Sequence, residues 1–180
     1  SSQQQAAAAI SDDLRQPIRM LRLLQGDVGS GKTVVALLAA AAVAEVGKQA
    51  ALMAPTEILA RQHIKTITPL AERAGLGVAI LTGREKGRAR ESVLMGLAAG
   101  EVDILIGTHA IFQEKVAYNK LGLVVIDEQH RFGVSQRLLL SAKAGRPPHL
   151  LVMTATPIPR TLTLTHFGEM DVSRIDEMPP

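Results

Sequence analysis

The chain has 180 residues, a net charge of +3 and a hydrophobic fraction of 47%, but aromatic residues make up only 2% of it. This length suits one domain with a buried core and is too short for two ordinary domains. The lack of cysteine excludes disulfides and thiolate metal sites, and the few aromatic rings disfavour single-strand binding by base stacking. The longest apolar run has 11 residues, whereas a membrane span needs roughly 20, so we expect a cytoplasmic protein without a membrane partner.

Apolar segments alternate with candidate helices along the chain. A partial leading helix is expected over residues 1–15. Strands are expected at Leu21–Leu24, Ala50–Ala54, Val78–Leu81, Ile104–Ile106, Leu123–Ile126 and Leu150–Met153. Helices are expected at Lys32–Val46, Thr56–Ala74, Lys86–Ala99 and Ser135–Lys143. Because the strands are almost continuously apolar, they predict an α/β fold with a mostly parallel sheet and helices on both faces.

We expect one domain over residues 1–180, with glycines at the ends of three predicted helices. Gly47, Gly75 and Gly100 each follow a helix where a left-handed residue usually closes the last turn. The leading helix begins without a capping residue, which indicates a truncated N-terminus. The segment 168–180 ends in two prolines and is expected to begin a linker.

A phosphate-binding loop is predicted between the first strand and the following helix, because the sequence there fits the pattern G-x-x-x-x-G-K-[ST]. The loop consists of Gly26, Asp27, Val28, Gly29, Ser30, Gly31, Lys32 and Thr33. The glycines let backbone N–H groups face phosphate, and the helix adds its positive end. Lys32 would reach the β and γ phosphates of ATP, and the Thr33 hydroxyl would bind Mg²⁺.

Two acidic residues follow the predicted strand Leu123–Ile126. The carboxyl ends of parallel strands gather at the ligand-binding edge of a sheet, so Asp127 and Glu128 are expected near the phosphate loop. Asp127 would hold Mg²⁺ through water. Glu128 would orient or deprotonate the water that attacks the γ phosphate.

Further motifs resemble those of superfamily 2 helicases, and they occur in that family's order. Asp127–His130 resembles motif II, Thr154–Pro157 motif III, Ala54–Glu57 motif Ia, and Thr82–Gly83 and Gly107–His109 the Ib and Ic elements. The resemblance extends from about Leu14 to Pro180. It implies a RecA-like P-loop NTPase domain, the helicase ATP-binding domain.

The extended motifs are most similar to those of the RecG family of bacterial DNA helicases. The similar segments are Gln25–Thr33, Asp127–Val134 and Met153–Thr161. The resemblance implies the first motor domain of an ATP-dependent helicase that drives branch migration and fork regression of branched DNA (forks and Holliday junctions) in recombination and repair. It also implies ATP and Mg²⁺ as cofactors, a wedge domain and a second motor domain in cis, a monomer, and a location at the bacterial nucleoid.

Four alternatives remain open. Transcription-repair coupling factors and PriA share much of the pattern, but they usually have Glu at the position of Gln129, and the former usually has Tyr at Ser30. An RNA helicase is disfavoured by the Arg131–Val134 context of the acidic box. A nucleotide-binding module without motor activity is disfavoured by the full set of motifs.

The resemblance also assigns roles outside the phosphate site. Gln129 and His130 would lie near the γ phosphate, and His130 would couple that site to Thr154 or Thr156. Contacts with the DNA backbone are expected from Pro55, Thr56, Thr82, Gly83, Thr108 and His109. Each of these six residues could instead be an ordinary cap or turn residue.

The resemblance also implies a contact between adenine and a residue near the start of the chain. The glutamine that contacts adenine in this family should precede the phosphate loop, where Gln3 and Gln4 are the candidates. The family's arginine fingers lie in the second motor domain, so the isolated chain is expected to hydrolyse ATP barely or not at all. His63, His149 and His166 lack metal-like spacing and are expected to be structural.

Overall fold

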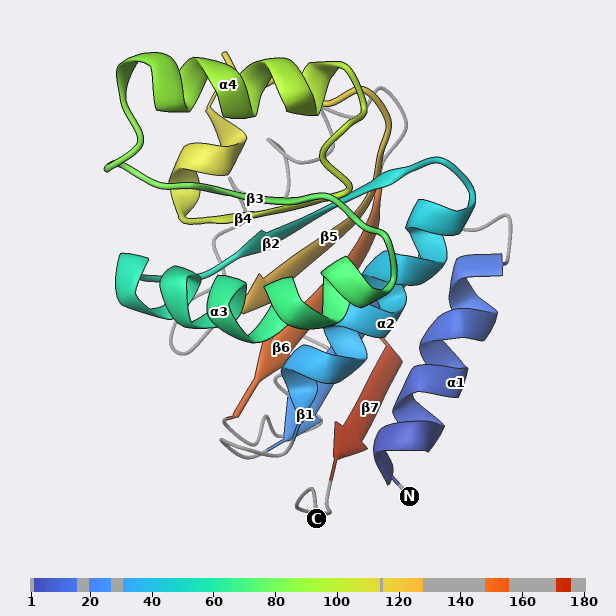
Figure 1. Cartoon of the computed structure of the whole chain (residues 1–180). Coiled ribbons are helices and arrows are strands. Elements are labelled where there is room, and N and C mark those ends of the chain that lie inside the picture. The colour runs from blue at the N-terminus through green and yellow to red at the C-terminus, as the bar shows by residue number, and fades with distance from the viewer. Residues whose placement is uncertain are drawn as a thin grey trace.

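Seven strands and four α-helices make up the described part of the chain (Figure 1). The computed structural model describes residues 2–15, 20–26, 31–113, 115–127, 148–155 and 171–175. The strands are β1 (Leu21–Gly26), β2 (Gln49–Met53), β3 (Val78–Leu81), β4 (Ile104–Gly107), β5 (Leu121–Asp127), β6 (His149–Thr154) and β7 (Asp171–Ile175). The helices are α1 (Ser2–Arg15), α2 (Lys32–Glu45), α3 (Glu57–Arg73), α4 (Gly87–Ala98) and the short 3-10 helix η1 (His109–Phe112).

The strands form one sheet in the order β3-β4-β2-β5-β6-β1-β7, and every pair is parallel. Leu23 pairs with Val152 across β1 and β6, and Ala51 pairs with Val124 across β2 and β5. All six strands that the sequence predicts are present, and the expected α/β fold is confirmed. The predicted helix Ser135–Lys143 lies outside the described residues.

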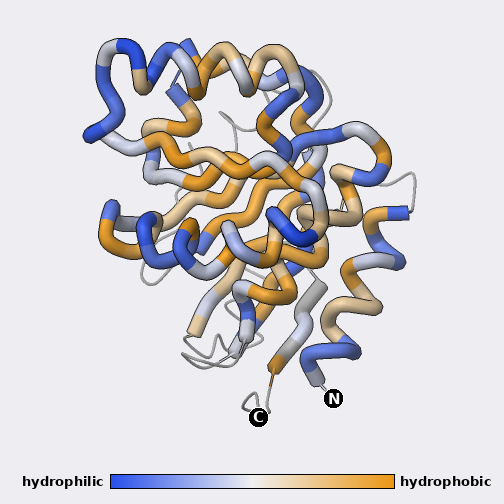
Figure 2. The backbone as a smooth tube through the Cα atoms, viewed as in Figure 1, coloured by the Kyte–Doolittle hydropathy of each residue, from blue (hydrophilic) through white to orange (hydrophobic). Residues whose placement is uncertain are grey.

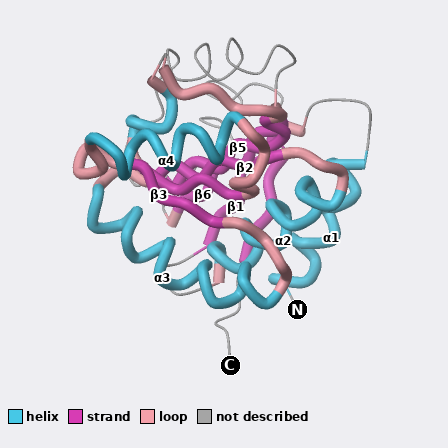
Figure 3. The backbone as a smooth tube through the Cα atoms, turned by 45° about the horizontal axis from the view of Figure 1, so that its top comes forward, coloured by secondary structure: helices cyan, strands magenta, loops and turns pink. Residues whose placement is uncertain are grey.

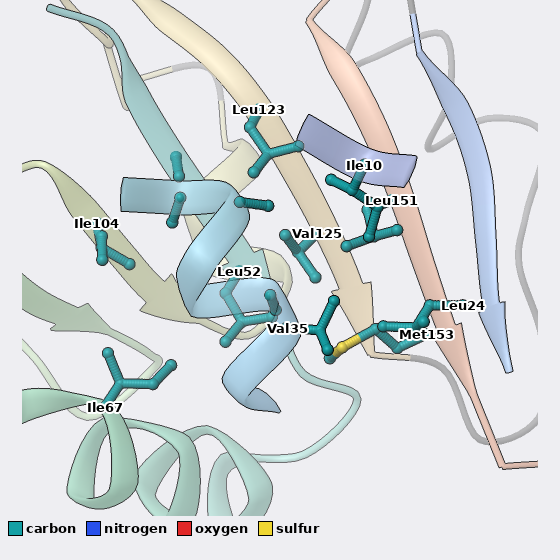
Figure 4. Packing of buried hydrophobic residues seen from close by; sticks show 14 of the residues in the cluster. Ile10, Leu24, Val35, Leu52, Ile67, Ile104, Leu123, Val125, Leu151 and Met153 are labelled. Carbon is teal, nitrogen blue, oxygen red and sulfur yellow. The ribbon is translucent and has the colours of Figure 1, made fainter. Parts of the chain in front are cut away.

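Helices cover the sheet on both faces, with α1, α2 and α3 on one side and α4 on the other (Figure 3). Alternate residues of β5 divide between two apolar clusters: Leu123 and Val125 pack towards α1 to α3, whereas Val124 and Ile126 pack towards α4 and η1. Figure 4 shows residues of the first cluster, and Figure 2 shows that the central strands are mostly apolar. Burial on both faces explains why these strands are continuously apolar. None of the described helices is long and apolar enough to cross a membrane.

The residues at the helix ends are of the types that commonly cap helices. Thr56 caps α3, because its hydroxyl accepts the backbone N–H of Leu59 at 3.3 Å. Gly47, Gly75 and Gly100 have φ angles of 79°, 75° and 80°. They therefore take the left-handed conformation predicted for them, which glycine adopts without steric strain.

The last described strand corrects the prediction for the segment 168–180, which was expected to begin a linker. Residues 171–175 instead form β7, an edge strand that pairs with β1. Only two of its five residues, Val172 and Ile175, are apolar, so a search for continuous apolar runs missed it. The buried Arg22 guanidinium joins three elements here, since it donates to Asp13 of α1 at 2.7 Å and to Ser173 of β7 at 2.7 Å.

Gly107 lies where β4 approaches β3 and η1 most closely. A Cβ atom there would overlap the carbonyl oxygen of Leu81 and come within 2.5 Å of the Ile111 side chain, and both neighbours are fully buried. We expect Gly107→Ala to lower the free energy of unfolding by about 1–3 kcal/mol, because the backbone must shift. Urea unfolding measures this.

Gly83→Ala is the matched control, because an added Cβ at Gly83 meets nothing within 4 Å. Its stability should change by less than about 0.5 kcal/mol. Equal stability of Gly107→Ala and wild type would contradict the close packing at this edge.

Candidate functional site

The candidate site lies at the edge of the sheet where the strands end. In the sheet, β6 separates β1 from β5, and the pairs Gln25–Thr154 and Asp127–Met153 align the three strand ends. Neighbouring strands are about 4.8 Å apart, so β1 and β5 end about 10 Å from each other. The phosphate loop after β1 and the acidic box after β5 therefore begin at one edge, as predicted.

The described residues of the phosphate loop are Gly26 at the end of β1 and Gly31, Lys32 and Thr33 at the start of α2. Gly31 has a φ of 93°, a left-handed conformation that favours glycine, and Lys32 begins α2. The Lys32 ammonium donates to the carbonyl oxygen of Gly26 at 2.5 Å, across the loop. Gly31 has no side chain that could accept hydrogen bonds from the first N–H groups of α2. These N–H groups can therefore donate to a bound anion.

Asp127 and Thr33, the two predicted Mg²⁺-binding residues, are joined by a histidine that the sequence analysis did not assign to the site. His63 Nε2 lies 2.6 Å from Asp127 Oδ2, and His63 Nδ1 lies 3.5 Å from the Thr33 hydroxyl. The exposed fractions of the His63 and Asp127 side chains are 11% and 15%. His63, expected to be structural, thus lies between the phosphate loop and the acidic residue.

Several predicted site residues lie outside the described residues. They are Asp27, Val28, Gly29, Ser30, Glu128, Gln129, His130 and Thr156. Their roles stay predictions. Thr154, the proposed partner of His130, is described at the end of β6 and is buried.

Gln3, one of the two candidates for the adenine contact, contacts the phosphate loop. Its side-chain amide donates to the carbonyl oxygen of Gly31 at 3.1 Å, although the two residues are 28 positions apart. Helix α1 packs against α2, which places the start of α1 beside the start of α2. A glutamine amide offers both a donor and an acceptor, which suits the edge of a nucleotide base.

The six candidate DNA contacts follow β2, β3 and β4, which are adjacent in the sheet. Pro55, Thr56, Gly83 and His109 are exposed, and Thr108 is half-buried. Thr82 differs from the others, because it is fully buried and its hydroxyl donates to Glu85 at 2.6 Å. Thr82 therefore shapes the turn after β3, and its hydroxyl faces inward.

Glu85 is the centre of a polar cluster beneath this turn. Its carboxylate accepts the Thr82 N–H at 2.7 Å and a guanidinium N–H of Arg61 at 2.7 Å. Burial by itself raises the pKa of Glu85, but the hydrogen bonds from Thr82 and Arg61 outweigh it and lower the pKa to about 2. The cluster fixes the turn after β3 to α3.

Comparison with known proteins places these features in a family context. The DEAD/DEAH box helicase family model matches residues 1–165. The ATP-dependent DNA helicase RecG of Bacillus subtilis (strain 168) is 56% identical over 179 residues, which cover 99% of this chain and 26% of that protein. RecG of Escherichia coli (strain K12) is 52% identical over 182 residues, with coverages of 99% and 26%. The chain thus spans about a quarter of the length of these curated relatives.

Solved structures agree with the sequence matches. The structure of RecG bound to a three-way DNA junction matches with a TM-score of 0.85 and 44% identity, over 99% of this chain and 24% of that chain. The Hef helicase domain of Pyrococcus furiosus matches with a TM-score of 0.63 and 20% identity, over 99% of this chain and 38% of that one, which shows a shared fold alone. The resemblance to RecG helicases that the motifs indicated is confirmed.

The pKa of Glu85 gives the cluster a defined pH dependence. Because the folded-state pKa is about 2 and the ordinary value is 4.5, ionised Glu85 stabilises the fold above about pH 4.5, and this stabilisation is lost towards about pH 2. We expect Glu85→Gln to be less stable than wild type at pH 7. The difference in the free energy of unfolding should narrow below about pH 4.5.

Urea unfolding at a series of pH values tests this, with Glu91→Gln as the control, since Glu91 is exposed on α4. The stability of that variant should follow wild type at every pH. A difference between wild type and Glu85→Gln that stays constant down to pH 2 would show that the carboxylate is not held as described.

Proposed function

Because the chain belongs to the DEAD/DEAH box helicase family, we propose that it is the ATP-binding motor domain of a bacterial DNA helicase of RecG type. The observation that carries this proposal is the convergence of Lys32, Thr33 and Asp127 at one edge of a parallel sheet. The full protein would use ATP to drive branch migration and fork regression. It would also contain a second motor domain and a wedge domain, and act as a monomer on chromosomal DNA in the bacterial cytoplasm.

The described residues fit a complex of Mg²⁺ and ATP. Among the described residues, no three His, Asp or Glu side chains are grouped so that they could hold a metal ion by themselves. Mg²⁺ does not need such a group, because it is usually held by one or two carboxylates together with substrate phosphates. Thr33 and Asp127 would supply the protein oxygens. Bound Mg²⁺ would neutralise the charge that develops on the phosphates.

The chain's own groups would bind and orient the nucleotide. The Lys32 ammonium would exchange the carbonyl oxygen of Gly26 for the β and γ phosphates, and the N–H groups of α2 would face the same anion. Glu128 would orient the attacking water and accept its proton. Gln129 and His130 would report the state of the γ phosphate to Thr154 and Thr156.

The DNA side of the proposal concerns the three neighbouring strand ends. Pro55, Thr56, Gly83, Thr108 and His109 would contact the phosphate backbone from the same edge that carries the nucleotide site. Such contacts are independent of base sequence, which suits a motor that moves along DNA. Thr82 would act through its backbone and by holding the turn, since its hydroxyl is bonded to Glu85.

The phosphate site is tested by Lys32→Ala. We expect this variant to lose Mg·ADP binding in calorimetric titration, because the ammonium is the charge that faces the phosphates. Its far-ultraviolet circular dichroism spectrum should match that of wild type. Binding of Mg·ADP by the variant with wild-type affinity would exclude the proposed loop.

The base contact is tested by Gln3→Ala, with Gln5→Ala on the exposed side of α1 as the matched control. We propose that Gln3 contacts adenine, because its amide already lies against Gly31. Paired hydrogen bonds to a base discriminate by about 1–3 kcal/mol. The preference for ADP over GDP should therefore fall about 5- to 150-fold in Gln3→Ala.

Gln5→Ala should keep the wild-type preference for ADP over GDP. An unchanged ratio of ADP to GDP affinity in Gln3→Ala would assign the contact elsewhere.

A further inference from the structure

Helix α3 brings one side chain, that of His63, to the candidate nucleotide site. His63 uses both ring nitrogens there: Nε2 contacts Asp127 at 2.6 Å and Nδ1 contacts the Thr33 hydroxyl at 3.5 Å. An ionised carboxylate only accepts hydrogen bonds, so the proton of a neutral His63 lies on Nε2 and Nδ1 accepts from Thr33. His63 therefore bridges two residues that lie 94 positions apart in the sequence.

These contacts leave the metal-facing atoms of both partners available. A hydroxyl that donates its proton to His63 keeps its lone pairs, so Thr33 can still bind a metal ion. Asp127 uses Oδ2 for His63 and retains Oδ1. Outer partners of this kind fix the orientation of metal-binding groups, and their loss typically weakens metal affinity about 10- to 100-fold.

The same helix is fixed near its N-terminus to the candidate DNA contacts. Thr56 caps α3 seven residues before His63, a distance of about 10 Å along the helix axis. Two residues before His63, Arg61 donates to Glu85 at 2.7 Å, and Glu85 holds the turn of Thr82. Buried Ala60, Ile67 and Ala71 pack α3 against the core, so the helix is held as one body.

We propose that His63 is a positioning residue through which α3 couples contact with the DNA backbone to the Mg²⁺-binding side chains Thr33 and Asp127. This inference rests on the function proposed above. A shift of α3 on DNA contact moves the imidazole, and the imidazole moves the two side chains that it bridges. The link reaches the nucleotide site from motif Ia and is separate from the link through His130, Thr154 and Thr156.

The first test measures the metal dependence of nucleotide binding in the full-length protein. Calorimetry gives the affinity for ADP with excess Mg²⁺ and with a chelator. In His63→Ala we expect the Mg·ADP affinity to fall about 10- to 100-fold, while the affinity for metal-free ADP stays within about twofold. Thr66→Ala, an exposed position one turn further along α3, should behave as wild type.

Two conservative variants keep the test decisive if His63→Ala does not fold. His63→Gln places an amide N–H near the position of Nε2 and retains the bond to Asp127, so it should restore Mg·ADP affinity to within about threefold. His63→Asn is too short to reach Asp127 and should bind Mg·ADP as weakly as the alanine variant.

The second test measures coupling as the ratio of affinities for a branched DNA with and without Mg·ADP. Allosteric coupling factors are typically about 5- to 150-fold, and the factor is the same in either direction. In His63→Ala the factor should fall at least about threefold, with a remainder carried by the link through His130, and the nucleotide-free DNA affinity should be unchanged. A merely structural role would weaken DNA binding and both forms of ADP binding together, which would overturn the proposal.

Lys32→Ala separates failure of this inference from failure of the proposed function. If Lys32→Ala loses Mg·ADP binding but His63→Ala keeps the wild-type metal dependence and coupling factor, the role of His63 is wrong and the nucleotide site stands. If Lys32→Ala binds Mg·ADP as wild type does, the nucleotide function itself is wrong, and the inference falls with it.

Discussion

Parallel pairing brings the carboxyl ends of β1, β5 and β6 to one edge of the sheet, and the candidate site depends on this arrangement. A parallel strand can follow another only after a crossover, so each strand end opens into a loop at the same edge. The phosphate loop, the acidic box and Thr154 therefore meet although they are far apart in sequence. An antiparallel sheet would divide the same motifs between two edges.

The continuous apolar strands were the most predictable part of the fold. Both faces of β5 are buried, so Leu123 to Ile126 are all apolar, and the strand stands out in the sequence. The edge strand β7 pairs with β1 alone among the described strands, and its apolar residues Val172 and Ile175 are separated by polar ones. It therefore looks like a loop when only continuous apolar runs are counted. Its contacts with β1 join residues far apart in the sequence, as in the hydrogen bond from Arg22 to Ser173, which lie 151 positions apart.

The candidate site likewise has a part that the sequence predicts and a part that it does not. Residues within a contiguous motif, such as Lys32 and Asp127, could be assigned from the sequence because their spacing to a strand or a helix is fixed. Contacts made across the fold could not. His63 and Asp127 are 64 positions apart, and Gln3 and Gly31 are 28 apart. A lone histidine on an amphipathic helix has no local pattern that distinguishes a structural role from a role in the site.

The order of strands in the sheet also determines when the phosphate-loop strand can fold during synthesis. Both neighbours of β1 are the last two strands, and the contact between Met20 and His149 spans 129 residues. On a ribosome, β1 therefore has no partner until β6 or β7 has emerged, whereas β2, β3 and β4 can pair earlier. The strand that precedes the phosphate loop is thus among the last of the described strands to be paired. Until then the apolar β1 has exposed edges, which are the surfaces that chaperones protect from aggregation.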